Sequence, residues 1–155
     1  MHAFATLRAA PEPFDLAFID AAGARRLVSL TVVIDGTEFA TYRADGLIIA
    51  TPTGSTAYSF SAGGPVVDPG VDALVLTPVA SHSLFDRPLV LPADAEIAVT
   101  ARTDRLVRVN VDKTDLGQIA EGETVGIRRG DRPARFVTFG SLTFPGLVRE
   151  KFGLE

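Results

Sequence analysis

The segment TPTGSTAYSFSAGGP, residues 51–65, concentrates hydroxyl groups and glycines in the middle of the chain. No charged residue or histidine occurs from Leu47 to Val67, although charged residues make up 22% of the sequence. If a strand feeds a short helix here, backbone N–H groups and hydroxyls gather at the start of that helix, where an anion or a polar ligand edge is favoured. Hydroxyls in this position can also read a base or a ribose.

A purely structural role competes with ligand binding for this segment. Ser, Thr and Gly also cap helices and pack tightly against sheets. The usual nucleotide fingerprints, a Walker lysine or a G-x-G-x-x-G after a strand, are absent. On a helix starting near Thr53, Tyr58 and Ser61 lie on one face, and the small side chain of Ala57 permits close approach by a flat ligand.

The remaining residues offer little catalytic or metal-binding chemistry. The chain has no cysteine, and its only histidines are His2 and His82. Ser81-His82-Ser83, with Asp86 nearby, has the residue types of an acyl-transfer triad. Adjacent positions rarely point at one another correctly, and no nucleophile elbow is present. We therefore expect no hydrolase, and we assign no catalytic residue and no metal ligand.

Alternating hydrophobicity predicts strands around the segment. Four apolar residues fall on one face of the first strand: Val28, Leu30, Val32 and Ile34. The pair Asp35-Gly36 favours a type I′ hairpin turn into a second strand over Thr37–Arg43. Further strands are predicted over Leu47–Ala50, Ala73–Thr77, Glu96–Ala101, Leu106–Asp112, Thr124–Arg129 and Arg135–Phe139.

This spacing predicts a mainly β fold with two packed sheets, resembling a β-sandwich. One short helix belongs to the hydroxyl-rich segment: Pro52 starts it, Thr51 or Thr53 caps it, and Gly63-Gly64-Pro65 stops it. A length of 155 residues with 46% hydrophobic content fits a single domain over 1–155.

Composition limits the partners and the compartment. The net charge is −4 and the Lys and Arg residues are scattered, which argues against nucleic acid. No stretch reaches eighteen apolar residues, and the N-terminal apolar run is too short for a signal peptide. The lack of cysteine fits the cytosol. We expect a cytoplasmic protein with neither a membrane nor a nucleic-acid partner.

The run YRADGLIIATPTGSTAYSFSAGGPVV, followed by DALVLTPVASHSLFDRPLVLP, resembles the C-terminal domain of the NAD kinases. The resemblance covers about residues 14–155 and is strongest from Tyr42 to Pro92. It implies phosphorylation of the adenosine-ribose 2′-hydroxyl of NAD to give NADP. It also implies NAD as the substrate, and ATP or polyphosphate with Mg²⁺ as the donor of the full enzyme.

The resemblance also implies a dinucleotide-binding set. The residues that would line the pocket are Thr53, Thr56, Ala57, Tyr58 and Ser61. Asp45 and Ala80 would approach the ligand across a subunit interface, so a homo-oligomer, a dimer or a tetramer, is expected. A plain turn residue before Gly46 is the alternative interpretation of Asp45.

Three departures from the family pattern bear on activity. The family's first domain, with its GGDG motif, has no counterpart in these residues, so the chain is predicted inactive alone. Where the family usually has Asn-Glu bonding the dinucleotide, an ungapped alignment places Asp15-Leu16; Asp15 joins the binding candidates, but leucine cannot accept a hydrogen bond. Asp112-Lys113-Thr114 stands where the family often has Asp-Gly-Gln.

Three hypotheses of function follow. The first is the NAD-binding and oligomerisation domain of an NAD kinase. The alternative is a non-catalytic dinucleotide-binding or assembly module derived from that family, favoured by the leucine at position 16 and the missing GGDG. The third is a β-rich interaction protein without a ligand.

Overall fold

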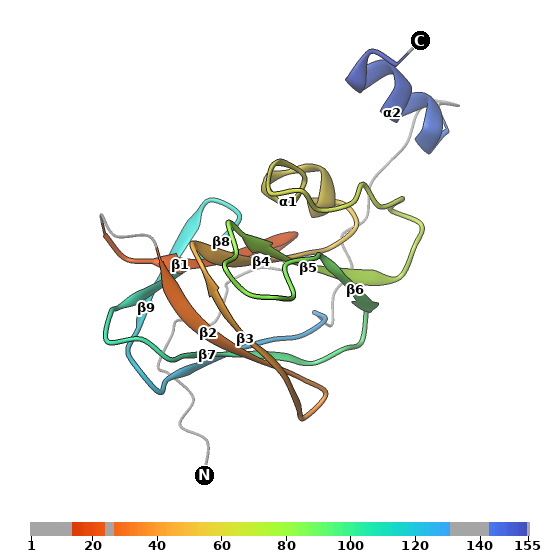
Figure 1. The fold of residues 1–155 in the computed structure, drawn as a ribbon. Coiled ribbons are helices and arrows are strands. Elements are labelled where there is room, and N and C mark those ends of the chain that lie inside the picture. Colours follow the sequence, from red (N-terminus) through yellow and green to blue (C-terminus); the bar gives the residue numbers. More distant parts are fainter. Residues whose placement is uncertain (1–13, 24–26, 131–142, 155) are drawn as a thin grey trace.

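The computed structural model describes residues 14–23, 27–130 and 143–154, and these form ten strands in two antiparallel sheets (Figure 1). The six-stranded sheet has the order β6 (Leu89–Pro92), β5 (Ala73–Val79), β4 (Gly46–Ala50), β1 (Leu16–Ala21), β8 (Val107–Val111), β9 (Thr114–Ile119). The four-stranded sheet has the order β10 (Thr124–Ile127), β7 (Ile97–Ala101), β2 (Val28–Ile34), β3 (Thr37–Ala44). The predicted mainly β fold with two sheets is confirmed.

The hydrophobic core lies between the two sheets, because strands of both contribute to one cluster of buried side chains. Strand β2 contributes Val28, Leu30 and Val32, and strand β1 contributes Ala17, Ile19 and Ala21. Successive residues of a strand point to opposite faces, so the intervening residues Phe18 and Asp20 lie on the outer face of the six-stranded sheet. That outer face carries the hydroxyl-rich segment.

The predicted β2–β3 hairpin is confirmed. Ile34 pairs with Thr37, and the two turn residues have positive φ, 48° at Asp35 and 76° at Gly36. Positive φ at both positions is the requirement of a type I′ turn, which Asp and Gly meet at low cost. The Asp35 carboxylate also accepts a hydrogen bond from the backbone N–H of Glu96, 2.8 Å away.

Most other predicted strands are present within a residue or two of the expected bounds, namely β4, β5, β7, β8 and β10. The strand predicted over Arg135–Phe139 falls outside the described residues. Three strands were not predicted: β1, β6 and β9. The edge strands β6 and β9 contain Pro92 and Gly117, residues that weaken a strand pattern but are tolerated at a sheet edge or a bulge.

A second α-helix, α2 (Phe144–Phe152), was not predicted either. The Thr143 hydroxyl caps it by accepting a hydrogen bond from Gly146 N–H, and Gly153 ends it in the left-handed conformation, with φ of 61°. The ring of Phe152 meets that of Phe60 with 5.0 Å between centroids, and α2 projects beyond α1 (Tyr58–Ser61) (Figure 1). At four and nine residues, the described helices are too short to cross a bilayer.

Candidate functional site

The hydroxyl-rich segment leaves the end of β4 and folds back over the outer face of the six-stranded sheet. It forms a 3₁₀ turn, η1 (Gly54–Thr56), and then the single α-helical turn α1. The predicted helix is therefore shorter than expected, because Ala57 has ψ of −132° and interrupts it. Of the two predicted caps, Thr51 accepts a bond from Gly54 N–H at 3.2 Å, whereas the Thr53 side chain makes no cap bond.

Two serines of the segment, Ser55 and Ser59, are fully buried. The Ser55 hydroxyl donates to the carbonyl of Pro52 at 2.6 Å and accepts from Val67 N–H at 3.0 Å. The Ser59 hydroxyl is 3.0 Å from that of Thr77 on β5, which is also fully buried. These bonds satisfy buried polar groups: those of Ser55 join residues of the segment and the loop after it, and that of Ser59 joins the segment to the sheet. Their structural role was not predicted.

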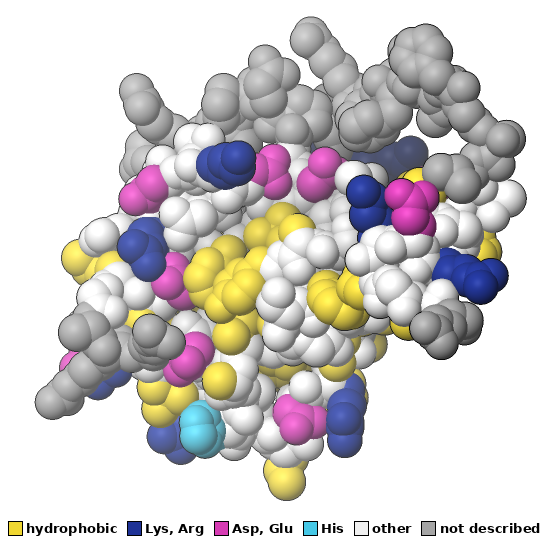
Figure 2. Space-filling model, turned by 90° about the horizontal axis from the view of Figure 1, so that it is seen from above, with side chains coloured by type: hydrophobic (Ala, Val, Ile, Leu, Met, Phe, Trp, Pro, Cys, Tyr) yellow, Lys and Arg dark blue, Asp and Glu magenta, His cyan; other side chains and the backbone are white. Residues whose placement is uncertain are grey.

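The five residues implied to line a pocket all lie on the exposed side of the segment: Thr53, Thr56, Ala57, Tyr58 and Ser61. We call them the exposed set. The Tyr58 side chain is 44% exposed, and its ring meets Phe18 of β1 edge to face, with 5.0 Å between centroids. Figure 2 views the molecule from above, the side on which α1 lies in Figure 1, and shows hydrophobic side chains in the middle of this face with acidic and basic side chains around them.

Asp15 lies directly beside the start of the segment. Its carboxylate oxygen Oδ1 accepts from the Thr51 hydroxyl at 2.7 Å, and its carbonyl accepts from Thr51 N–H at 2.9 Å. No hydrogen bond from the described residues reaches the other carboxylate oxygen, Oδ2. A Cβ at Gly54 would collide with the Asp15 carbonyl, so the two backbones are in close contact. The structure therefore brings Asp15 to the start of the segment.

Leu16, in contrast, is a packing residue. It is buried with Ile48 and Ala50 in a small cluster on the outer face of the sheet, and Ala62 at the end of α1 packs against that cluster. The side chain thus supports α1 from below and offers no polar contact. The Asp15 carboxylate is an acidic group at this corner, and the carboxylate of Asp112 lies beside it.

Asp45 and Ala80 lie together, but at the opposite end of β4 from Thr51. Asp45 N–H donates to the carbonyl of Val79 at 2.9 Å, next to Ala80. Ala80 has a positive φ of 47°, a strained conformation for a residue with a Cβ. No hydrogen bond among the described residues joins this pair to the exposed set. Within one chain the structure therefore does not bring them to the rest of the site.

A charged pair lies on the outer face of the six-stranded sheet, the face that carries the hydroxyl-rich segment. Arg108 on β8 donates twice to Asp20 on β1, at 2.8 and 3.2 Å, and Asp20 lies two residues from Phe18 on the same face of the strand. The bond to Asp20 raises the pKa of Arg108. This pair was not predicted, although the alternation in LAFIDA and VRVNV would have placed both charges on the outward side of their strands.

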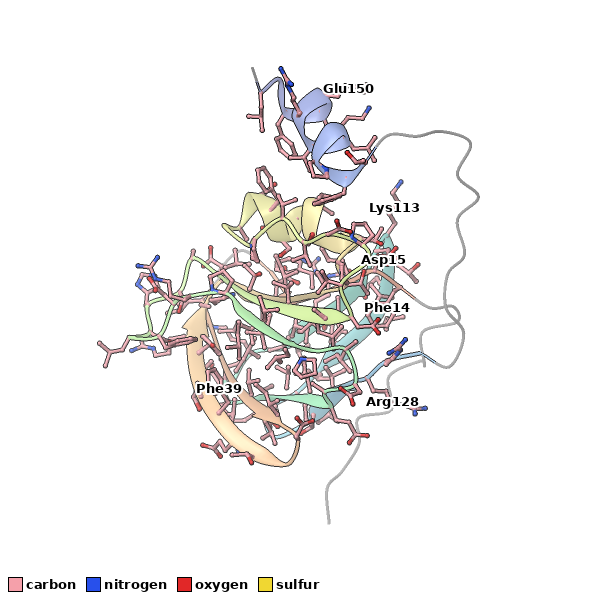
Figure 3. All side chains as sticks on the ribbon, turned by 90° about the vertical axis from the view of Figure 1, so that its right-hand side faces the viewer. Phe14, Asp15, Phe39, Lys113, Arg128 and Glu150 are labelled. Atoms are coloured by element: carbon pink, nitrogen blue, oxygen red, sulfur yellow. The ribbon has the colours of Figure 1, made fainter. Side chains whose placement is uncertain are left out.

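The turn between β8 and β9 also reaches the segment's neighbourhood. Asp112 has φ of 48°, and its Oδ1 accepts from the backbone N–H groups of Asp15 and Leu16 at 3.3 and 3.1 Å. Figure 3 shows Asp15 and Lys113, the residue after Asp112, on the same side of the molecule, to the right of α1 in this view. Lys113, where the family often has glycine, is exposed.

The loop with His82 is bonded to the backbone of Arg43. His82 N–H donates to the carbonyl of Arg43 at 2.7 Å, and the Ser83 hydroxyl accepts from Arg43 N–H at 3.0 Å. In the part of the chain that the structure describes, no bond joins the imidazole to a serine hydroxyl or to Asp86. Nor do three or more acidic or imidazole side chains gather there as ligands for a metal.

The model of the ATP-NAD kinase C-terminal domain matches residues 15–139 of this chain. Among similar proteins, the NAD kinase of Gemmatimonas aurantiaca is 47% identical over 132 residues, which is 84% of this chain and 46% of the relative. The NAD kinase of Ralstonia nicotianae is 38% identical over 138 residues, 89% of this chain and 46% of the relative. The chain thus spans less than half the length of these curated relatives.

Solved structures give the same likeness. The yeast NADH kinase complexed with NADH superimposes with a TM-score of 0.68 at 37% identity, covering 72% of this chain and 33% of that one. An NAD kinase from Archaeoglobus fulgidus in complex with ATP superimposes with a TM-score of 0.69 at 29% identity, covering 78% of this chain and 47% of that one.

Proposed function

Because the chain belongs to the ATP-NAD kinase family, matching its C-terminal domain, we propose that it is the dinucleotide-binding and oligomerisation domain of an NAD kinase. The reaction of the whole enzyme would be phosphorylation of the adenosine-ribose 2′-hydroxyl of NAD to give NADP. Residues 1–155 would form one domain, in the cytoplasm. The small molecules named for the two solved relatives, NADH and ATP, support this substrate class.

The observation that carries the proposal is the division of the hydroxyl-rich segment into two sides. Ser59 bonds it to β5 and Ser55 bonds it to the loop that follows, and the exposed set lies on the other side. Tyr58 would stack on the ligand or bond at its edge, and Ala57 would let the ligand approach the backbone. The hydroxyls of Thr53 and Ser61 remain able to bond a base, a ribose or a phosphate, and that of Thr56, which donates to the Thr53 carbonyl at 3.3 Å, can still accept.

Asp15 would complete the recognition of a ribose. Its Oδ1 is engaged by Thr51, while Oδ2 can accept from a ligand hydroxyl. This division of the carboxylate assigns one oxygen to holding the segment and the other to binding. Leu16, packed under α1, takes no part in the contact.

The described residues do not supply the transfer of the phosphoryl group. Attack by the 2′-hydroxyl requires a group that accepts its proton, and the family resemblance assigns that group to the GGDG domain. No acidic cluster suited to Mg²⁺ is present among the described residues, so no step through the metal is assigned to this chain. We expect the chain alone to form no NADP from NAD, ATP and Mg²⁺.

The proposal includes a homo-oligomer, a dimer or a tetramer. Asp45 and Ala80 lie at the far end of β4 from Thr51, so within one chain they do not face the exposed set. A second copy would bring them to the ligand, as the resemblance implies. The positive φ of Ala80 supports a functional role there, since such strain persists where the surroundings enforce it.

Calorimetric titration of the purified chain with NAD tests the proposal. Tyr58→Ala should abolish the binding that the wild-type chain shows. Phe39→Ala is the matched control, because Phe39 is 40% exposed and meets Phe85 edge to face at 5.5 Å, as Tyr58 meets Phe18. Equal affinity in all three proteins would exclude the exposed set as the site. No binding by the folded wild-type chain would instead favour the assembly module. The apolar packing of Leu16, where the family usually has a polar residue, also supports that alternative.

A further inference from the structure

Three segments that are far apart in the sequence meet at the start of β1. Asp112 lies in the β8–β9 turn, Asp15 immediately precedes β1, and Thr51 follows β4. Hydrogen bonds join Asp112 to Asp15 across 97 positions and Asp15 to Thr51 across 36. Thr51 in turn bonds Gly54, the first residue of η1. We call this chain of bonds the β1 clasp.

Asp112 is bonded to the start of β1 through both its side chain and its backbone N–H. Its Oδ1 accepts from Asp15 N–H and Leu16 N–H, while its own N–H donates to the carbonyl of Leu16 at 2.8 Å. Hydrogen bonds to a charged acceptor are stronger than those between neutral groups. The carboxylate of Asp112 therefore fixes where β1 begins.

The start of β1 then fixes the segment that follows β4. Thr51 is bonded to Asp15 twice, through its hydroxyl at 2.7 Å and through its N–H at 2.9 Å. Gly54 touches the Asp15 carbonyl so closely that a Cβ at Gly54 would collide with it. A shift of Asp15 must therefore move Thr51 and Gly54, and with them the exposed residues on either side of η1.

We propose that Asp112 is a positioning residue for dinucleotide affinity, which acts through the β1 clasp and does not touch the dinucleotide. The proposal rests on the proposed function only for the identity of the ligand. The positioning of Gly54 is a property of the ligand-free chain. The turn between β8 and β9 thus sets the geometry of a loop formed some sixty positions earlier in the sequence.

The test removes the Asp112 carboxylate without straining the backbone. Asp112 has φ of 48°, which glycine adopts freely, so Asp112→Gly should fold while losing the bonds to β1. Asp35→Gly is the matched control. Asp35 also has φ of 48° and also accepts from a distant backbone N–H, that of Glu96. Its hairpin turn lies at the bottom of Figure 1, whereas α1 lies at the top.

Two readouts separate positioning from binding. The first is hydrogen exchange of the Gly54 amide by NMR without ligand, and the second is the dissociation constant for NAD by calorimetry. Asp112→Gly should speed exchange at Gly54 and weaken NAD binding about tenfold each, as expected for loss of bonds to a charged acceptor. Asp112→Asn, which keeps an acceptor oxygen, should restore both values to within about threefold.

An unchanged rate of hydrogen exchange at Gly54 in Asp112→Gly would overturn the proposal. An equal increase of that rate in Asp35→Gly would also overturn it, because the effect would then be a general destabilisation. NAD binding that is unaffected by a loosened Gly54 would also overturn it. If the wild-type chain binds no NAD while Gly54 responds only to Asp112→Gly, the positioning stands and the proposed function of the isolated chain fails.

Discussion

Ser59 and Ser61 stand two positions apart in one segment, yet the structure treats them in opposite ways. Ser59 is fully buried and shares a hydrogen bond with Thr77 of β5, whereas Ser61 is exposed. Ser55 and Thr56 differ in the same manner, because the Ser55 side chain is buried and bonds Pro52 and Val67 while Thr56 lies at the surface. Whether a hydroxyl of this segment makes structural hydrogen bonds or faces solvent therefore depends on which residues lie beside it in the folded chain.

The comparison separates two properties that substitutions can measure independently. Changes on the buried side should lower the free energy of unfolding, because they remove satisfied polar contacts or introduce collisions. Changes on the exposed side should leave stability intact and weaken ligand binding. A buried-side substitution that leaves stability unchanged, or an exposed-side substitution that lowers it, would contradict this division.

The largest stability effect is expected on the buried side at Gly54. In Gly54→Ala the new methyl group would collide with the Asp15 carbonyl, a backbone atom that cannot turn aside. We expect the free energy of unfolding to fall by about 3 kcal/mol, the upper range for overpacking. Urea denaturation measures it. Gly126→Ala on β10, where a Cβ would meet no atom within 4 Å, should be neutral or slightly stabilising.

The hydroxyl of Tyr42 differs from the buried hydroxyls of Ser55 and Ser59 because it has no hydrogen-bond partner among the described residues. The Tyr42 side chain is fully buried in the core. Burial raises the pKa of Tyr42 from 10 to about 12. The unfolded chain therefore loses this proton first as the pH rises, which favours unfolding.

The stability linked to Tyr42 should be complete below pH 10 and be lost progressively as the pH rises from 10 to about 12. The loss should reach about 2 kcal/mol, and Tyr42→Phe should remove this part of the pH dependence. Urea denaturation at a series of pH values measures it. An identical alkaline decline in wild type and Tyr42→Phe would show that other groups cause it.

A smaller effect separates the two serines. Ser59→Ala leaves the buried Thr77 hydroxyl without its partner, so the free energy of unfolding should fall by about 1 to 2 kcal/mol. Ser61→Ala removes an exposed hydroxyl and should change stability by less than about 0.5 kcal/mol. Thermal unfolding of the two variants compares them directly. Equal losses would mean that exposure does not divide the segment.

The parts of the fold that could be predicted depend on local chemistry. Asp35-Gly36 between two alternating runs specifies a hairpin, because the turn and its register are decided within a few residues. Strand β1 was missed because its support is not local. It pairs with β4 and β8, whose residues lie about 30 and 90 positions away in the sequence.

The candidate site follows the same rule. The composition indicated the hydroxyl-rich segment and the family resemblance named five of its residues, but neither could divide the serines, since the buried role of Ser59 depends on Thr77 of β5. The helix was predicted too long because capping signals at Thr51 and Pro52 do not reveal the break at Ala57. The contacts of Asp15 with Asp112 and Thr51 join distant segments, which no local pattern records.

The most direct measurement of the central claim uses the two tyrosines of the chain, Tyr42 and Tyr58. Tyr42 is buried between the sheets and Tyr58 belongs to the exposed set, so selective labelling of tyrosine gives one NMR signal for each. During titration with NAD, the account predicts that the Tyr58 signal shifts to saturation while the Tyr42 signal stays in place. Saturable binding that leaves the Tyr58 signal unmoved would contradict it.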